Sequence, residues 1–339
     1  MKQHTKRSAT YLRVFLLVFL AFFLTASQAL ADKLIFKVED PRGDDHGNGR
    51  LLYPIRSDFE RGDLDVIGFA AKKARGGTQF EITFARPIRA TDRQAIDDLG
   101  TNLNDVARLG FYTFNVDIYI DFDQREGSGF TRLLPGRHAE LAPGLGWDRA
   151  ILLTPRPAET KRALSDIMIK ELSEALRDGN YDASNIDAAK EKLPADMNLR
   201  VHFPNRVRVM GQKVTFFVPE LFLGGQAQAD WSYTVAVTGA SLIQSFDLAA
   251  SAGLADSTAG NLGILPISPG KWQNRFGGGR DDEPLQPPLV DILVPAGASQ
   301  EALLSDFDSR DDRRVQLPGI VPAEVTASRS STSGAAPGQ

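Results

Sequence analysis

Apolar and polar side chains alternate along much of this chain, and such alternation is typical of half-buried β-strands. It is clearest over residues 114–121, where Phe, Val, Ile and Ile occupy the even positions and Asn, Asp, Tyr and Asp the odd ones. Clusters of Gly, Pro and Asp separate this segment from other short runs of the same kind. We predict further strands at residues 34–38, 80–84, 147–154, 199–203, 207–210, 214–218, 231–238 and 289–294. The pattern therefore predicts an all-β fold, an antiparallel β-sandwich.

One segment, residues 156–192, follows helical spacing instead. From Leu164 onward, apolar residues recur three or four positions apart, which places them on one stripe of a helix. Gly179 is expected to end this helix, and Ser184 with Asp187 resembles a capping box for a second one. We expect a helical insertion near 156–192 that packs on one face of the sandwich. A helix that docks a partner protein is the alternative.

Residues 1–31 have the three parts of a secretory signal peptide. Basic residues without acidic partners come first, residues 14–24 form an uninterrupted apolar run, and Ala29-Leu30-Ala31 is a small-x-small cleavage pattern. A membrane anchor is the alternative, but a spanning helix needs about 20 apolar residues and this run is shorter. We expect cleavage after Ala31 and a periplasmic or secreted protein with no membrane span after cleavage.

The C-terminal residues 323–339 are rich in Ala, Ser, Thr, Gly and Pro and have few charges. Such a composition cannot build a core, so we expect a disordered tail. No repeat of solenoid length is visible before it. We therefore expect residues 32–322 to form one sandwich domain.

Composition narrows the range of functions. The chain has 39 Lys and Arg against 43 Asp and Glu, a formal net charge of −4 at pH 7, so we expect no nucleic-acid partner. The absence of cysteine excludes disulfides, thiolate metal sites, cysteine nucleophiles and covalently attached haem. No serine-hydrolase, P-loop or dinucleotide motif occurs, so we expect that the protein is not an enzyme. Two convergent acids of a glycoside hydrolase would not stand out in one sequence, so a hydrolase stays open as an alternative.

Acidic residues gather in two loops that follow predicted strands. The first loop, residues 40–49, also contains glycines, which let the backbone fold tightly enough to bring carboxylates together. Calcium takes six to eight oxygen ligands, so we expect calcium at these loops. At the first loop, the alternative is an Asx-rich turn without an ion. The metal ligands that we expect are Asp40, Asp44, Asp45 and Asp65 at the first loop and Asp121 and Asp123 at the second.

Haem needs axial ligands such as His or Met. The chain provides His46, His138 and His202 together with several methionines, but without paired metal-ligand spacing. We therefore do not expect haem, and a b-type haem protein is kept as an alternative.

Aromatic side chains are candidates for sugar binding, because the apolar faces of pyranose rings stack on them. Trp147 and Trp231 start predicted strands and are expected in the core. Trp272 instead lies in the polar, glycine-rich loop 269–279, among Lys, Gln, Asn and Arg side chains that can bond hydroxyl groups. We expect Trp272 to be the stacking platform. The ligand-binding residues that we expect are Tyr53, Trp272, Arg275 and Phe276.

Several short sequence motifs occur one after another along the chain. Residues 40–49 read DPRGDDHGNG and are followed by Tyr53-Pro54. Later stretches come in this order: GDLD at 62–65, VDIYID at 116–121, LPGR at 134–137, WD at 147–148, FGGG at 276–279, VDILVP at 290–295 and LPG at 317–319. Together, over about residues 33–322, they resemble the C-terminal module of glucodextranases and related amylopullulanases.

This resemblance implies a DOMON-like, jelly-roll-like sandwich that is non-catalytic, related to carbohydrate-binding modules and likened to surface-layer homology modules. Members of the wider fold bind sugars or haem, and some carry calcium. The helical stretch 156–192 has no counterpart in the motif, and we expect the module to stand alone, without a catalytic glycosidase domain.

We therefore expect an exported, non-catalytic carbohydrate-binding or cell-envelope-associated module. Its expected partners are a polysaccharide or cell-wall glycan and a separate glycosidase or envelope protein. The alternatives are a haem-binding electron-transfer subunit on the same fold and a glycoside hydrolase accessory protein.

Overall fold

The computed structural model describes residues 33–91, 103, 107–179, 181–241 and 262–325. The expected signal peptide and the chain from residue 326 lie outside the described residues. Within the described ranges, no helix is both long and apolar enough to cross a membrane. Ala323 donates its backbone N–H to the Ala229 carbonyl at 2.8 Å, and Val325 packs against the main core. Residues 323–325 therefore also pack against the sandwich, three residues beyond the expected domain boundary at residue 322.

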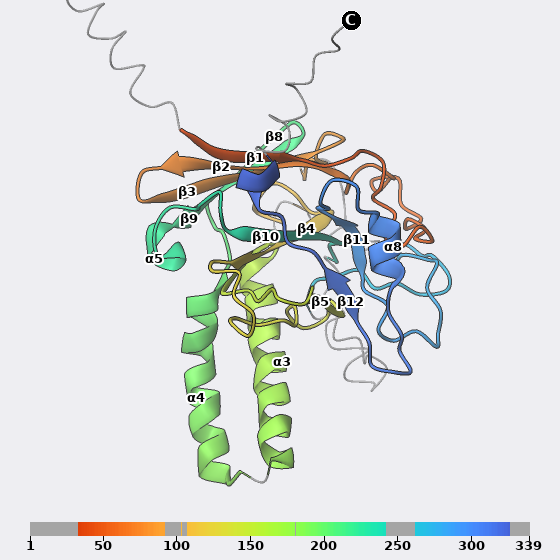
Figure 1. The fold of residues 1–339 in the computed structure, drawn as a ribbon. Helices are drawn as coiled ribbons and strands as arrows, with labels where there is room; N and C mark the ends of the chain where they lie inside the picture. The colour runs from red at the N-terminus through yellow and green to blue at the C-terminus, as the bar shows by residue number, and fades with distance from the viewer. Residues whose placement is uncertain (1–32, 92–102, 104–106, 180, 242–261, 326–339) are drawn as a thin grey trace, which may run out of the picture.

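Two five-stranded sheets form the sandwich (Figure 1). The first sheet has the order β1-β2-β3-β9-β8, and its neighbouring strands are antiparallel. The second has the order β11-β10-β4-β6-β7 and is antiparallel except between β6 and β7. The strands of the first sheet are β1 (Leu34–Glu39), β2 (Val66–Ala74), β3 (Gly77–Phe84), β9 (Lys213–Pro219) and β8 (Val207–Met210). Those of the second are β11 (Leu289–Ile292), β10 (Ser232–Gly239), β4 (Phe114–Asp121), β6 (Arg149–Leu153) and β7 (Val201–His202). The predicted all-β sandwich is confirmed.

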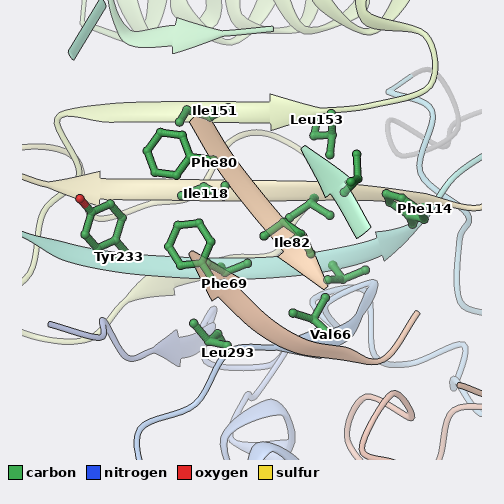
Figure 2. Packing of buried hydrophobic residues seen from close by; sticks show 14 of the residues in the cluster. Val66, Phe69, Phe80, Ile82, Phe114, Ile118, Ile151, Leu153, Tyr233 and Leu293 are labelled. Carbon is green, nitrogen blue, oxygen red and sulfur yellow. The ribbon is translucent and has the colours of Figure 1, made fainter. Parts of the chain in front are cut away.

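The main core lies between the two sheets, where the apolar positions of the alternating segments meet (Figure 2). Phe69 of β2 stacks on Phe80 of β3 with ring centroids 5.8 Å apart. Ile118 of β4 and Ile151 of β6 are buried in the same core. Burying each such side chain stabilises the fold by about 1.5–3 kcal/mol. The alternation in the sequence therefore decides which face of each strand points inward.

The outer face of the second sheet is covered as well. The short strands β5 (Ala139–Leu141) and β12 (Val315–Leu317) pair in parallel, and with α8 (Gln300–Ser305) they pack on this face. All eight residues of β4 are consequently buried, although the alternation there is typical of a half-buried strand. Asp117 on the covered face pairs with the buried Arg137, with an Nε–Oδ2 distance of 2.6 Å.

The helical insertion is a hairpin of α3 (Pro157–Asp178) and α4 (Ala183–Arg200), which follows β6, precedes β7 and projects from the sandwich (Figure 1). Its base joins the second core through Leu164 and Met197. A short helix, α5 (Glu220–Leu223), follows β9. The predicted insertion is therefore present, and it continues to residue 200 rather than 192.

Two details of the insertion differ from the sequence prediction. The second helix is capped by Asp182, whose carboxylate accepts a hydrogen bond of 2.9 Å from the Asn185 N–H, and Ser184 donates its hydroxyl to the same carboxylate. A carboxylate is a strong N-cap acceptor, so the helix begins before the expected capping box. Leu199, which was expected in a strand, lies in the last turn of α4 with its side chain exposed.

Candidate functional site

Two segments that are distant in the sequence lie side by side at one edge of the fold. We call residues 40–55, which follow β1, the acidic segment, and residues 269–279 the tryptophan loop. Leu52 and Gly277 exchange two backbone hydrogen bonds, of 3.0 and 2.8 Å. Gly278 has a φ of +90°, and a Cβ at this position would collide with the backbone of the acidic segment. Glycine therefore permits the close approach of the two segments.

The paired segments expose three large apolar side chains, which we call the Trp272 surface. Leu52, Ile55 and Trp272 are 50%, 55% and 57% exposed. The Ile55 N–H donates to the Trp272 carbonyl at 3.1 Å, and Arg275, also exposed, accepts a backbone hydrogen bond from Trp272 at 3.2 Å. One exposed apolar side chain is ordinary, whereas several on hydrogen-bonded segments indicate an interaction surface. The structure places the expected residues Trp272 and Arg275 on this surface.

Tyr53 and Phe276, which the sequence suggested as ligand contacts, lie beneath the surface. Phe276 is completely buried, and the partly buried Tyr53 meets its ring edge-on with centroids 5.4 Å apart. The Tyr53 hydroxyl donates to the carboxylate of Asp45. The complete burial of Phe276 corrects the expectation of direct ligand contact for that residue, whereas contact by the partly buried Tyr53 stays a prediction.

Four carboxylates converge beside the start of the acidic segment, and we call them the acidic cluster: Asp40, Asp44, Asp65 and Asp291. One carboxylate oxygen from each of Asp40, Asp44 and Asp291 lies within 4.8 Å of the other two. Asp65, directly before β2, is close enough to repel all three electrostatically. The fold therefore brings three expected metal ligands together with Asp291 of β11, which the sequence analysis did not select.

Each carboxylate of the cluster has an oxygen that nothing else in the described chain satisfies. Backbone N–H groups bond one oxygen of Asp40, Asp65 and Asp291, donated by Val294 at 3.2 Å, Gly43 at 2.7 Å and Val66 at 2.6 Å respectively. The second oxygens of these three residues and one oxygen of Asp44 are buried without a hydrogen-bond partner among the described residues. Unpartnered buried carboxylate oxygens are costly unless a proton or a cation compensates them.

The electrostatics of the cluster follow from burial. Burial raises the pKa of the Asp40 carboxyl to about 8, and the neighbouring Asp44 and Asp65 add to the shift. Burial likewise raises the pKa of Asp65 to about 6 and that of Asp291 far above its ordinary value. Asp45, also an expected ligand, accepts hydrogen bonds from Tyr53 and from the Gly62 N–H at 2.6 Å through one oxygen, and its other oxygen is buried without a partner among the described residues. The carboxylates of the cluster can therefore be neutralised either by protons or by a hard cation. Asp45 lies beside the cluster.

In the second expected metal loop, backbone N–H groups bond the carboxylates. One oxygen of Asp121 accepts from the Gln124 N–H at 2.7 Å and the other from the Gly146 N–H at 3.0 Å. Asp123 accepts from the Arg125 N–H at 3.2 Å. Asp148, which the sequence analysis missed, approaches the two acids but bonds the Phe122 N–H. These backbone contacts are those of an Asx-type turn, and oxygens of Asp121, Asp123 and Asp148 also lie within 4.8 Å of one another, so calcium at this loop stays a prediction.

The three histidines considered as haem ligands have separate partners. His46 Nε2 lies 2.6 Å from a carboxylate oxygen of Glu301. His138 Nδ1 contacts the Gln286 carbonyl at 3.2 Å, and His202 packs on the ring of Phe222 with centroids 5.1 Å apart.

A rigid antiparallel sandwich that presents an exposed aromatic and aliphatic surface on its loops has the arrangement of a ligand-binding module. Residues 35–318 match the family described as the C-terminal binding module, SLH-like, of glucodextranase. The chain belongs to this family, as its motifs led us to expect. Membership suggests a protein of the cell envelope or of the outside of the cell. No curated protein matches the chain.

Proposed function

We propose that this protein is an exported, non-catalytic carbohydrate-binding module that retains a polysaccharide or cell-wall glycan at the Trp272 surface. The observation that supports this most directly is the exposure of Trp272 beside Ile55 and Leu52, on backbone held by hydrogen bonds. An indole ring stacks on the apolar face of a pyranose, and flanking aliphatic side chains extend the platform. Membership in a family of glucodextranase binding modules supports the same ligand class.

Polar groups around the platform suit sugar hydroxyls. Lys271, Gln273, Asn274 and Arg275 are all exposed beside Trp272. Their ammonium, amide and guanidinium groups offer several hydrogen-bond donors within one loop. Exposed donors of this kind can select among hydroxyl patterns while the stacked ring supplies affinity.

Affinity electrophoresis tests the proposal. Native gels that contain α-glucans or peptidoglycan should retard the wild-type protein on at least one glycan, and Trp272→Ala should restore free mobility. Unchanged wild-type migration on every glycan would remove the basis for assigning a glycan-binding function.

A further inference from the structure

We propose that Asp40, Asp44 and Asp291 hold a calcium ion that fixes the acidic segment against the sandwich, with the negative charge of Asp65 beside them. Asp291 supplies the decisive observation. Its side chain is 0% exposed, one of its oxygens has no hydrogen-bond partner in the described chain, and this carboxylate approaches those of Asp40 and Asp44. The large majority of buried polar side-chain atoms have a partner, so this oxygen points to a group that bonds it.

The geometry suits a calcium ion. Calcium–oxygen distances are about 2.4 Å, so two oxygens that share one ion are at most about 4.8 Å apart. The oxygens of Asp40, Asp44 and Asp291 fall within that limit. All the donors are carboxylates, which favours a hard cation, and water or backbone carbonyls would complete the six to eight ligands that calcium takes.

A cavity lies next to one of the proposed ligands. A cavity of about 380 Å³ opens between β1 and the chain that follows β11. Asp40 lines it, together with Val38 and Val294. The cavity therefore borders the cluster at Asp40.

The surroundings connect the cluster to the whole acidic segment. Gln300 of α8 donates its side-chain amide to the Asp44 carbonyl and accepts from the Ile292 N–H at 2.8 Å. The Gly47 N–H donates to the Val290 carbonyl at 2.8 Å, beside Asp291. An ion held by Asp44 and Asp291 would therefore reinforce the contact between this segment and β11. This segment carries Leu52 and Ile55, so the ion also sets the position of the Trp272 surface, an extension that rests on the proposed function.

Calcium titration tests the site itself. Metal-free protein titrated with CaCl₂ in a calorimeter should bind one ion per chain and unfold at a higher temperature as calcium increases. Asp291→Asn should weaken binding at least about tenfold, because even the loss of an indirect partner of a metal ligand costs about 10- to 100-fold. The matched control is Asp187→Asn, an exposed acid of α4 outside both acidic loops, which should bind calcium as the wild type does.

Three results would overturn the calcium site. They are the absence of saturable calcium binding to the wild type, equal binding by wild type and Asp291→Asn, and equal affinity for Mg²⁺ and Ca²⁺. If Asp291→Asn does not fold, Asp44→Asn, the least buried of the three ligands, takes its place with the same expected loss.

Glycan retention tests the extension separately. Chelator should weaken retention of the wild type at least about fivefold, the lower range of ordinary coupling between sites. Calcium binding with no glycan retention in any condition contradicts the proposed function and leaves the site intact. Calcium binding with retention that chelator does not change contradicts the link between the ion and the surface.

Discussion

Asp117 and Asp291 show how much the surroundings of a single residue decide. Both stand in the tripeptide Val-Asp-Ile, and both are buried on strands of the second sheet. Arg137 meets Asp117 with two hydrogen bonds, of 2.6 and 3.1 Å, whereas Asp291 is surrounded by acids. The charge on Asp117 is therefore balanced within the chain, and that on Asp291 requires a proton or a cation. The two tripeptides are identical, so the sequence could not distinguish these roles.

Removing the partner of Asp117 should be strongly destabilising. Arg137→Met leaves a buried, uncompensated carboxylate and should lower the free energy of unfolding by about 3–5 kcal/mol. The double variant Arg137→Met/Asp117→Leu should recover most of that loss, because no charge is then left buried. Urea unfolding curves measure both, and a cost below about 1 kcal/mol for the single variant would contradict this role.

The acidic cluster predicts a pH dependence in the absence of calcium. The pKa of Asp40 is raised from 3.8 to about 8 and that of Asp65 to about 6, so the folded state binds protons more tightly than the unfolded state. Their contribution to stability is complete below about pH 4 and is lost as the pH rises through about 6 and then about 8.

Thermal unfolding with chelator, compared between wild type and Asp40→Asn, isolates this effect. The Tm of the wild type relative to the variant should fall between about pH 4 and pH 8, since the amide does not titrate. A relative Tm that rises over this range would contradict the raised pKa of Asp40.

At the scale of secondary structure, the periodic elements were predictable and the short or non-periodic ones were not. The alternation in β4 and the helical spacing in α3 identified both elements. β2 was missed because most of its residues are buried and its apolar run does not alternate. β5 and β12 have only three residues each, which is too short for any period to show. Because these two strands were not predicted, the second core, to which both contribute residues, was not predicted either.

Within the hairpin of α3 and α4, side chains that pack in the second core should contribute more to stability than exposed ones. Leu164 is completely buried in the second core, whereas Leu199 is 65% exposed. Leu164→Ala should lower the free energy of unfolding by about 2–5 kcal/mol, and Leu199→Ala by less than about 0.5 kcal/mol. Denaturant unfolding of this matched pair checks the difference, and equal costs would mean that the hairpin packs differently.

For the whole molecule, the sequence predicted the sandwich, the helical insertion and the family. It also indicated that Trp272 lies in a polar loop. It could not show that this loop pairs with residues 40–55, because contacts between such distant segments depend on the folded topology. For the same reason, Asp291 was not connected with Asp40 and Asp44 before the fold brought them together.

Export is the prediction that concerns the chain as a whole. The basic, apolar and small-residue order of residues 1–31 should direct secretion with cleavage after Ala31. Intact-mass measurement of the protein recovered outside the cytoplasm should give a chain that begins at Asp32. A mass that retains residues 1–31 would contradict cleavage and favour the membrane anchor.

The central claim is that the exposed ring of Trp272 binds glycan, and one matched comparison tests it most directly. Tyr181, at the tip of the hairpin, is also 57% exposed and serves as the control aromatic. Glycan retention and the free energy of unfolding are measured for wild type, Trp272→Ala and Tyr181→Ala. Both variants should unfold within about 0.5 kcal/mol of the wild type, and only Trp272→Ala should lose retention. Equal retention by all three proteins, or a loss of about 3–5 kcal/mol in Trp272→Ala, would contradict a surface platform.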